Sequence, residues 1–214
     1  MGNGDGQRMC ENLTQEDHWE NCWSSSISMR LPSPFHVNNR NIQRLLKRHV
    51  GPGKKILEIG CAPGKTLAWI ASLGICEVAG LDYSQKGISN CQALFKALQL
   101  EGDLRCEDAF STSFAQDSFD LVYSFGVIEH FTDSREIIFR HLLLARPGGK
   151  VLMVIPNFGG VQGRLFKRLA PDAAAMHNLT MMSVNALLLL VPTDQVNFAK
   201  AYPEGRISPW HWGL

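Results

Sequence analysis

The sequence lacks the segments that would place a protein in or across a membrane. Its longest apolar run, residues 186–191 (ALLLLV), is far shorter than the roughly 20 residues that span a bilayer. The first residues, MGNGDGQRMCENLTQEDHW, contain neither a basic lead nor an apolar stretch, which argues against a secretory signal peptide. We therefore expect a cytoplasmic protein without stable membrane insertion.

The sequence also has little excess charge and no close grouping of cysteines. The 21 Lys and Arg residues nearly balance the 20 Asp and Glu residues, so nucleic acid is not expected as a partner. The six cysteines form no Cys-x-x-Cys pair and no short Cys/His cluster, so no metal site is expected. A chain of 214 residues suits a single domain, and its sequence leaves the oligomeric state unknown.

Short apolar runs alternate with amphipathic segments through most of the chain. The pattern predicts helices over residues 41–50, 66–73, 84–100 and 134–145. It predicts strands over residues 55–59, 77–82, 104–106, 119–125 and 150–155. This alternation favours an α/β fold, a Rossmann-like doubly wound and mostly parallel sheet with helices on both faces.

Three regions of one domain can be distinguished. Residues 1–39 form a polar leader whose Trp19 and Trp23 need burial, so we expect the leader to dock as a lid. Residues 40–157 form the Rossmann-like core. Residues 158–214 are expected to build an acceptor pocket from partly helical segments and to offer a sixth strand at 196–202.

The first strand leads into a glycine loop, ILEIGCAPGKT at residues 56–66, which ends like a phosphate-binding loop. The spacing excludes that function, because only three residues separate Gly60 from Gly64 and Pro63 has no N–H to offer. The dinucleotide fingerprint also fails, since Ala62 replaces its second glycine. Lys65 is accordingly expected to be a solvated residue at the start of a helix.

Acidic side chains follow the second and third strands at the edge where ligands of such sheets bind. Asp82 is placed to accept hydrogen bonds from the hydroxyls of an unphosphorylated ribose. Asp108 is placed to accept one from an adenine amino group, although the adjacent Glu107 leaves the register open. The ligand indicated contains ribose and adenine and needs no phosphate cradle.

Five motifs resemble those of the class I S-adenosylmethionine-dependent methyltransferases. Residues 58–64, EIGCAPG, are similar to the first motif, E-x-G-x-G-x-G in its usual form. The others, in family order and spacing, are DYS at 82–84, EDA at 107–109, FDLV at 119–122 with GVIEHF at 126–131, and RPGGK at 146–150. The resemblance implies S-adenosyl-L-methionine as cofactor and a methyltransferase acting on an oxygen or nitrogen of a small-molecule acceptor.

The resemblance also implies which residues bind the cofactor. Glu58 would orient the loop and approach the methionine amino group, while Asp82 and Asp108 would hold ribose and adenine. The full set is Glu58, Gly60, Cys61, Ala62, Gly64, Asp82, Tyr83, Asp108, Ala109 and Phe125. Two features depart from the family: Ala62 stands at the usual middle glycine, and the C-terminal hairpin that closes the sheet is incomplete.

Two histidines are candidate catalytic bases. Histidine accepts protons near neutral pH, so His130 after the fourth strand, or His177 in the acceptor segment, could deprotonate an acceptor. Simple packing roles remain open for both rings. The alternative hypothesis is a non-catalytic S-adenosylmethionine-binding or scaffold protein of the same fold.

Overall fold

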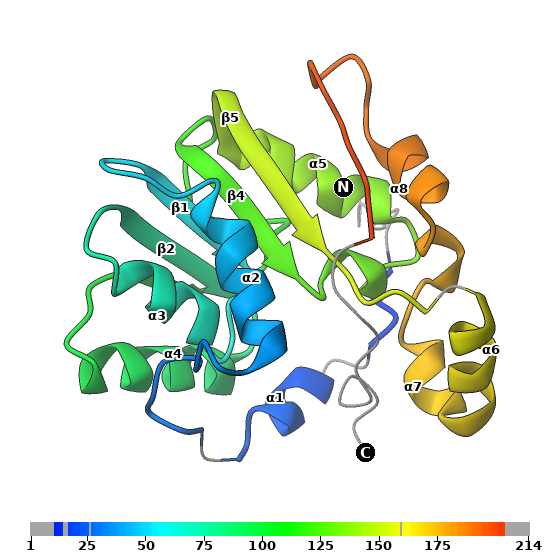
Figure 1. Cartoon of the computed structure of the whole chain (residues 1–214), viewed down its shortest axis with the longest axis horizontal. Helices are drawn as coiled ribbons and strands as arrows, with labels where there is room; N and C mark the ends of the chain where they lie inside the picture. Colours follow the sequence, from blue (N-terminus) through cyan, green and yellow to red (C-terminus); the bar gives the residue numbers. More distant parts are fainter. Residues whose placement is uncertain (1–10, 15–16, 26, 159, 204–214) are drawn as a thin grey trace, which may run out of the picture.

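A five-stranded sheet forms the centre of the computed structural model, which describes residues 11–14, 17–25, 27–158 and 160–203. The strand order is β3-β2-β1-β4-β5 and every pairing is parallel, which confirms the Rossmann-like prediction (Figure 1). The order reverses between β1 and β4, and ligands of such sheets bind beyond that point. The strands are β1 Lys55–Ile59, β2 Glu77–Asp82, β3 Asp103–Cys106, β4 Phe119–Phe125 and β5 Ala145–Val154.

Helices cover both faces of the sheet (Figure 1). Successive residues of β1 point to opposite faces, as the pleat requires: Ile56 packs in one core cluster, and Leu57 and Ile59 pack in another. Helices α2, α3 and α4 cover the Ile56 face, and α5 covers the other. These helices are α2 Val37–Lys47, α3 Lys65–Ala71, α4 Gln85–Ala97 and α5 Ser134–Leu144. Helix α2 therefore starts earlier than predicted, inside the expected leader.

The segment after β5 folds into short helices that pack against α5. Buried Phe158 and Phe166 join Ile137 and Ile138 in a third core cluster, so this segment belongs to the same domain. Its elements are α6 Gly160–Leu169, α7 Pro171–Ala175, the 3₁₀ turn η2 Leu179–Met181 and α8 Val184–Leu190. No helix among the described residues is long and apolar enough to cross a bilayer.

The prediction of a sixth strand at 196–202 is wrong. All of these residues are described and none is in a strand, and Phe198 is 80% exposed. A strand at this position would have to bury its apolar side chains against the sheet, which Phe198 does not do. Within the described part of the chain, no antiparallel hairpin joins the sheet.

Residues 146–149, which lie between the predicted helix 134–145 and the predicted strand 150–155, are part of β5. Phe119 pairs with Ala145 and Leu121 with Lys150, so β5 carries an irregularity opposite Asp120. The Arg146 guanidinium lies 2.7 Å from the Asp120 carboxylate and ties this irregularity to β4. An extra stretch on one strand is the feature of a β-bulge, which the Pro-Gly-Gly sequence accommodates.

The described residues of the leader lie along the carboxyl ends of the strands (Figure 1). Leu13 N–H donates to the His130 carbonyl at 2.7 Å, and Asn90 Nδ2 donates to the carbonyl of Trp23 at 2.9 Å, just after α1 His18–Cys22. Lys65 is not solvated as expected: its Nζ donates to the carbonyls of Ser28 and, at 2.8 Å, of Arg30. An ammonium at the start of α3 thus holds the leader in place.

Candidate active site

The glycine loop turns sharply after β1. Gly60 has φ +70° and Gly64 has φ +84°, a left-handed backbone that favours glycine. A Cβ on Gly60 would lie 2.5 Å from Cγ2 of Val127, so the loop also abuts the segment after β4. The N–H groups of Gly60 and Cys61 donate to the Leu81 carbonyl at 2.8 and 3.1 Å, which fixes the loop against the end of β2.

The Cys61 side chain points into the core and away from the loop surface. It is 3% exposed, and its Sγ lies 4.0 Å from Sγ of Cys91. Only the backbone of Cys61 can therefore line a ligand site. The backbone of Ala62 is already engaged within the protein. Its N–H donates to Oδ2 of Asp82 at 3.2 Å and so links the loop to the end of β2.

Asp82 is buried at the carboxyl end of β2. Its Oδ1 accepts from the N–H of Ser84 at 2.9 Å, and its Oδ2 accepts from the N–H of Ala62. Burial raises the pKa of Asp82, while these two hydrogen bonds act in the opposite direction. Each carboxylate oxygen has a second lone pair, so the group can accept two further hydrogen bonds without moving.

Glu58 lies within the sheet, where Tyr123 Oη donates to its Oε2 at 2.8 Å. Burial raises the pKa of Glu58 to about 8 and outweighs the Tyr123 hydrogen bond, which lowers it. A cation beside this carboxyl would favour its charged form. Glu58 is thus suited to a positively charged ligand group.

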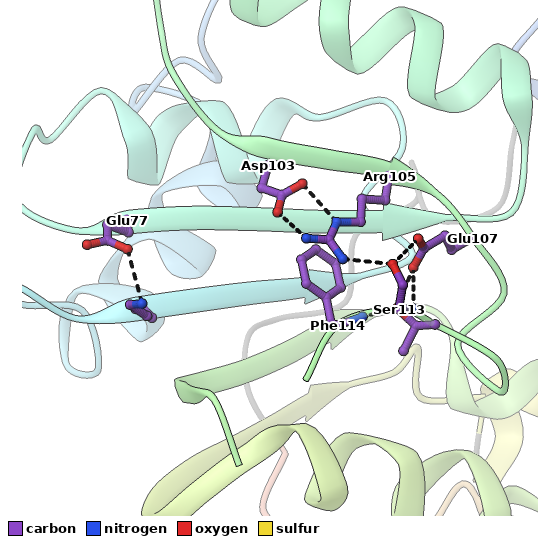
Figure 2. A network of polar contacts seen from close by, with 8 residues as sticks. Glu77, Asp103, Arg105, Glu107, Ser113 and Phe114 are labelled. Atoms are coloured by element: carbon purple, nitrogen blue, oxygen red, sulfur yellow. Dashed lines mark hydrogen bonds and ion pairs between the residues drawn. The ribbon is translucent and has the colours of Figure 1, made fainter. Parts of the chain in front are cut away.

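Glu107 is engaged within its own turn (Figure 2). Its carboxylate accepts from Thr112 Oγ1 at 2.6 Å and from Ser113 Oγ at 2.5 Å. Arg105 adds to this network by donating to Ser113 Oγ at 2.8 Å and by forking onto Asp103 (Figure 2). The neighbouring Asp108 carboxylate accepts from the N–H of Phe110 at 3.0 Å.

Three other predicted cofactor residues lie in different surroundings. Tyr83 follows β2 and is 40% exposed beside the leader. Phe125 ends β4 and packs edge to face on Tyr123, with ring centroids 5.7 Å apart. Ala109 is half-buried against the second and third core clusters, so little of its side chain can face a ligand.

The structure brings the two predicted histidines together. His130, in the 3₁₀ turn η1 Ile128–His130, and His177, after α7, have ring centroids 4.6 Å apart. Nδ1 of His130 lies 2.7 Å from the Met176 carbonyl, and Nδ1 of His177 lies 2.7 Å from the Ala173 carbonyl. A carbonyl oxygen only accepts, so each Nδ1 carries the hydrogen and each neutral ring keeps a lone pair on Nε2.

A sequence profile described as a methyltransferase domain matches residues 57–153, which contain the glycine loop, Asp82, Asp108 and His130. This part of the chain is a class I S-adenosylmethionine-dependent methyltransferase domain. S-adenosylmethionine is the cofactor of the domain, and the residues described above fit it. The fixed Asp82 carboxylate can accept hydrogen bonds from ribose hydroxyls, and an ammonium group beside Glu58 would favour its charged form.

Individual relatives agree with this assignment. The chain is 28% identical over 152 residues to a probable S-adenosylmethionine-dependent methyltransferase of Mycolicibacterium smegmatis, covering 71% of this chain and 51% of that protein. It is 30% identical over 151 residues to phosphoethanolamine N-methyltransferase 2 of Caenorhabditis elegans, covering 68% and 33%. The chain thus spans about half or less of the length of these curated relatives.

A solved structure shows the same fold as the methyltransferase domain. The PH0226 protein of Pyrococcus horikoshii superposes with a TM-score of 0.58 at 20% identity, covering 71% of this chain and 69% of that one. At this identity the likeness establishes the fold alone. It supports the strand order that places the glycine loop, Asp82 and His130 along one edge of the sheet.

His130 is buried and His177 is half-buried, and the pKa values of both histidines are lowered. Burial lowers the pKa of His130 to about 4, more than the hydrogen bond to Met176 raises it. Burial also lowers the pKa of His177. The Trp19 ring packs edge to face on His130 at 5.2 Å, so the leader contributes to this burial. Near pH 7 both rings can accept a proton, although burial makes them weak bases.

Glu129, which stands beside His130 after β4, was not among the predicted catalytic or cofactor-binding residues. Its side chain is fully buried, and neither carboxylate oxygen has a hydrogen-bond partner among the described residues. Burial raises the pKa of Glu129 to about 8. Its backbone carbonyl accepts from the N–H of Asn178 at 2.6 Å, which ties the His177 segment to η1. The signal in the sequence was its position directly after β4 and beside His130.

Proposed function

We propose that this protein transfers a methyl group from S-adenosylmethionine to an oxygen or nitrogen of a small-molecule acceptor. The observation that carries the proposal is the pair of Nε2 lone pairs on His130 and His177, next to the glycine loop. The loop and the turn that holds His130 are neighbours, because Gly60 abuts Val127. A methyl donor held by the loop would therefore face two proton acceptors.

The cofactor would be held by groups along one edge of the sheet. Asp82 would accept hydrogen bonds from the ribose hydroxyls, and Glu58 would pair with the methionine ammonium. Because the carboxylate of Glu107 is used within its own turn, Asp108 is the better candidate for the adenine amino group. The backbone of the loop would line the methionine moiety, and Tyr83 and Phe125 would flank the cofactor.

Methyl transfer mainly requires that the acceptor be aligned with the methyl group and that water be excluded. Methyl transfer is a displacement at a carbon bound to sulfonium, and the departing sulfur needs no proton. An acceptor hydroxyl, however, must lose a proton as the methyl arrives, and an ammonium must lose one before its nitrogen can attack. His130 or His177 would take it on Nε2. The docked leader, with Trp19 over His130, would exclude water from the reacting groups.

The class of acceptor is supported by charge and by the relatives. A near-neutral chain suits a small molecule better than a nucleic acid, and it is consistent with action in the cytoplasm. Curated relatives include an O-methyltransferase of Pyrenophora dematioidea and the N-methyltransferase of Caenorhabditis elegans named above. Both oxygen and nitrogen acceptors therefore belong in the same screen.

Cofactor binding tests the first part of the proposal. We expect S-adenosylhomocysteine to bind with a Kd in the micromolar range by calorimetry, and ATP not to bind, because the loop lacks a phosphate cradle. Tighter binding of ATP would contradict the assignment.

Turnover tests the catalytic part against the alternative of a non-catalytic binding protein. Phenols, catechols and phosphorylated ethanolamines should be screened with S-adenosylmethionine labelled in its methyl group. On the acceptor found, His130→Ala should reduce kcat by about 10² to 10⁴ while leaving S-adenosylhomocysteine affinity nearly unchanged. His177→Ala is the matched variant, since either ring could act as the base. If both variants keep wild-type kcat, neither histidine is the base.

A further inference from the structure

Three potential metal ligands converge beside the proposed acceptor site. Glu129, His130 and His177 each offer one ligand atom, and these atoms lie within 4.8 Å of one another. The residues come from two segments far apart in the chain, η1 and the turn after α7. The hydrogen bond between Asn178 N–H and the Glu129 carbonyl, at 2.6 Å, holds these segments together.

The Glu129 carboxylate is the strongest sign that this cluster can bind a ligand. It is fully buried, and both of its oxygens lack a hydrogen-bond partner among the described residues. A buried carboxyl group without partners costs free energy, and such groups are normally paired or bound to a metal. Gly126 has φ +66°, and a Cβ there would lie at ordinary contact distance, 3.5 Å, from Glu129 Oε1, so the carboxylate faces this turn.

Both imidazoles are oriented as metal ligands usually are. Nδ1 of His130 donates to the Met176 carbonyl and Nδ1 of His177 to the Ala173 carbonyl, each at 2.7 Å. Metal-bound histidines commonly donate their second N–H to a carbonyl or carboxylate, which fixes the ring and the tautomer. Because Nδ1 carries the hydrogen in each ring, the Nε2 lone pair is the one that can bind a metal ion.

We propose that Glu129, His130 and His177 form a binding site for one divalent transition-metal ion. Two imidazoles and one carboxylate form a donor set that suits Zn²⁺ or Fe²⁺ and suits Mg²⁺ poorly, because Mg²⁺ requires oxygen ligands. Three protein ligands leave a coordination position for another molecule. An ion there could bind an acceptor oxygen and lower the pKa of its hydroxyl, in place of a free histidine base.

The cluster has to contract slightly to bind an ion. Ligands bound tetrahedrally at about 2.0 to 2.1 Å lie about 3.4 Å from one another, closer than the 4.8 Å limit of this cluster. Rotation of the Glu129 carboxylate meets no hydrogen bond that must break, since its oxygens have no partner among the described residues. His177 is half-buried after a short helix and can follow.

Direct metal binding to the full chain tests the site without any methyl transfer, so its outcome is separate from that of the proposed function. Protein stripped with a chelator should bind about one Zn²⁺ per chain in calorimetry, with Mg²⁺ showing no comparable binding. Bound Co²⁺ should give the visible absorption bands of a Co²⁺ ion with few ligands. It should not give the near-ultraviolet bands of thiolate ligands, and their absence would exclude the cysteines as ligands. Absence of stoichiometric Zn²⁺ binding, or binding of Mg²⁺ with equal affinity, would overturn the proposal.

Variants assign the binding to these residues. Glu129→Gln and His177→Gln should each weaken Zn²⁺ binding at least tenfold, while His36→Gln, at an exposed histidine, should leave it unchanged. If Glu129→Gln does not fold, His177→Gln decides, because its position is half-buried. Wild-type affinity in the folded His177 variant would show that Zn²⁺ binds elsewhere and would refute the site.

Discussion

The carboxylate of Asp82 is held by the N–H groups of Ser84 and Ala62, so it is already oriented for a ligand. Asp82→Ala should weaken S-adenosylhomocysteine binding by about 2 to 3 kcal/mol, because charge-assisted hydrogen bonds to the ribose are lost. Calorimetry measures the change, and Asp103→Ala is the control, since Asp103 lies at the opposite end of the sheet. An unchanged Kd in a folded Asp82 variant would place the ribose elsewhere.

Gly60 shows how a single residue permits the loop. Gly60→Ala should destabilise the fold by about 2 to 4 kcal/mol in urea unfolding, because φ +70° is strained for alanine and its Cβ would lie 2.5 Å from Val127 Cγ2. Gly53→Ala is a matched control, with φ +68° and nothing within 4 Å of the added Cβ. Gly53→Ala should lower the free energy of unfolding only by the backbone strain, about 1 to 2 kcal/mol. Equal losses in the two variants would show that the contact with Val127 has no energetic effect.

The contacts between residues of the site could be predicted only in part from the sequence. The position of Asp82 follows from the strand pattern, because the end of a parallel strand fixes where its last side chain lies. The direction of the Cys61 side chain and the partners of Lys65 depend on how the loop and leader pack, which no local pattern encodes. The contact between His130 and His177 depends on the chain's path through α6 and α7, so the sequence suggested each histidine but not their pairing.

At the scale of elements, the leader is attached by a few polar contacts. The double variant Lys65→Met and Asn90→Ala removes the bonds to the carbonyls of Arg30 and Trp23. Each lost hydrogen bond is worth about 1 kcal/mol, so cleavage by chymotrypsin within residues 17–36 should rise at least about fivefold. Lys55→Met is the control, because Lys55 pairs with Glu77 on the sheet surface. Equal cleavage of all three proteins would mean that other contacts hold the leader.

The predicted bounds of strands and helices agree best with the structure where a buried apolar run defines the element. The bounds of β1, β2 and β4 match the predicted ranges, since each is an apolar run that ends at a turn or a polar residue. Residues 146–149 fall between the predicted helix and the predicted fifth strand because Pro-Gly-Gly usually ends a helix, yet they are part of β5, in which Ala145 pairs with Phe119. Residues 196–202 have the composition of a strand but no packed face, and composition alone cannot distinguish these cases.

At the scale of the whole molecule, the site lies where separately packed parts meet. One core cluster holds α2, α3 and α4 on the sheet, another lies on the α5 face, and the third joins α5 to the segment after β5. The glycine loop and Asp82 belong to the sheet, while His177 belongs to the third cluster's segment. The leader contacts both sides, through Trp19 at His130 and Trp23 at Asn90. Stability of the whole fold and the geometry of the site are therefore linked.

Buried ionisable groups away from the histidine pair predict how stability varies with pH. The pKa of Glu58 is raised from 4.5 to about 8, so its contribution to stability is full below pH 4.5 and is lost as pH rises through about 8. The pKa of His141 is lowered from 6.5 to about 4, so its contribution is full above pH 6.5 and is lost as pH falls through about 4. Burial causes both shifts, and the thermal midpoint should be highest between about pH 5 and 6.5.

Two neutral substitutions test this pH dependence in opposite directions. Glu58→Gln removes the carboxyl group whose pKa is raised in the core, so its stability relative to wild type should improve by about 4 kcal/mol between pH 5 and pH 9. His141→Gln should show the reverse, gaining relative to wild type as pH falls from 7 to 4, even though it loses the bond to Ser124 Oγ at 2.9 Å. Thermal unfolding without cofactor, followed by circular dichroism, gives both differences. A difference between Glu58→Gln and wild type that stays constant with pH would mean that the pKa of Glu58 is the same in the folded and the unfolded protein.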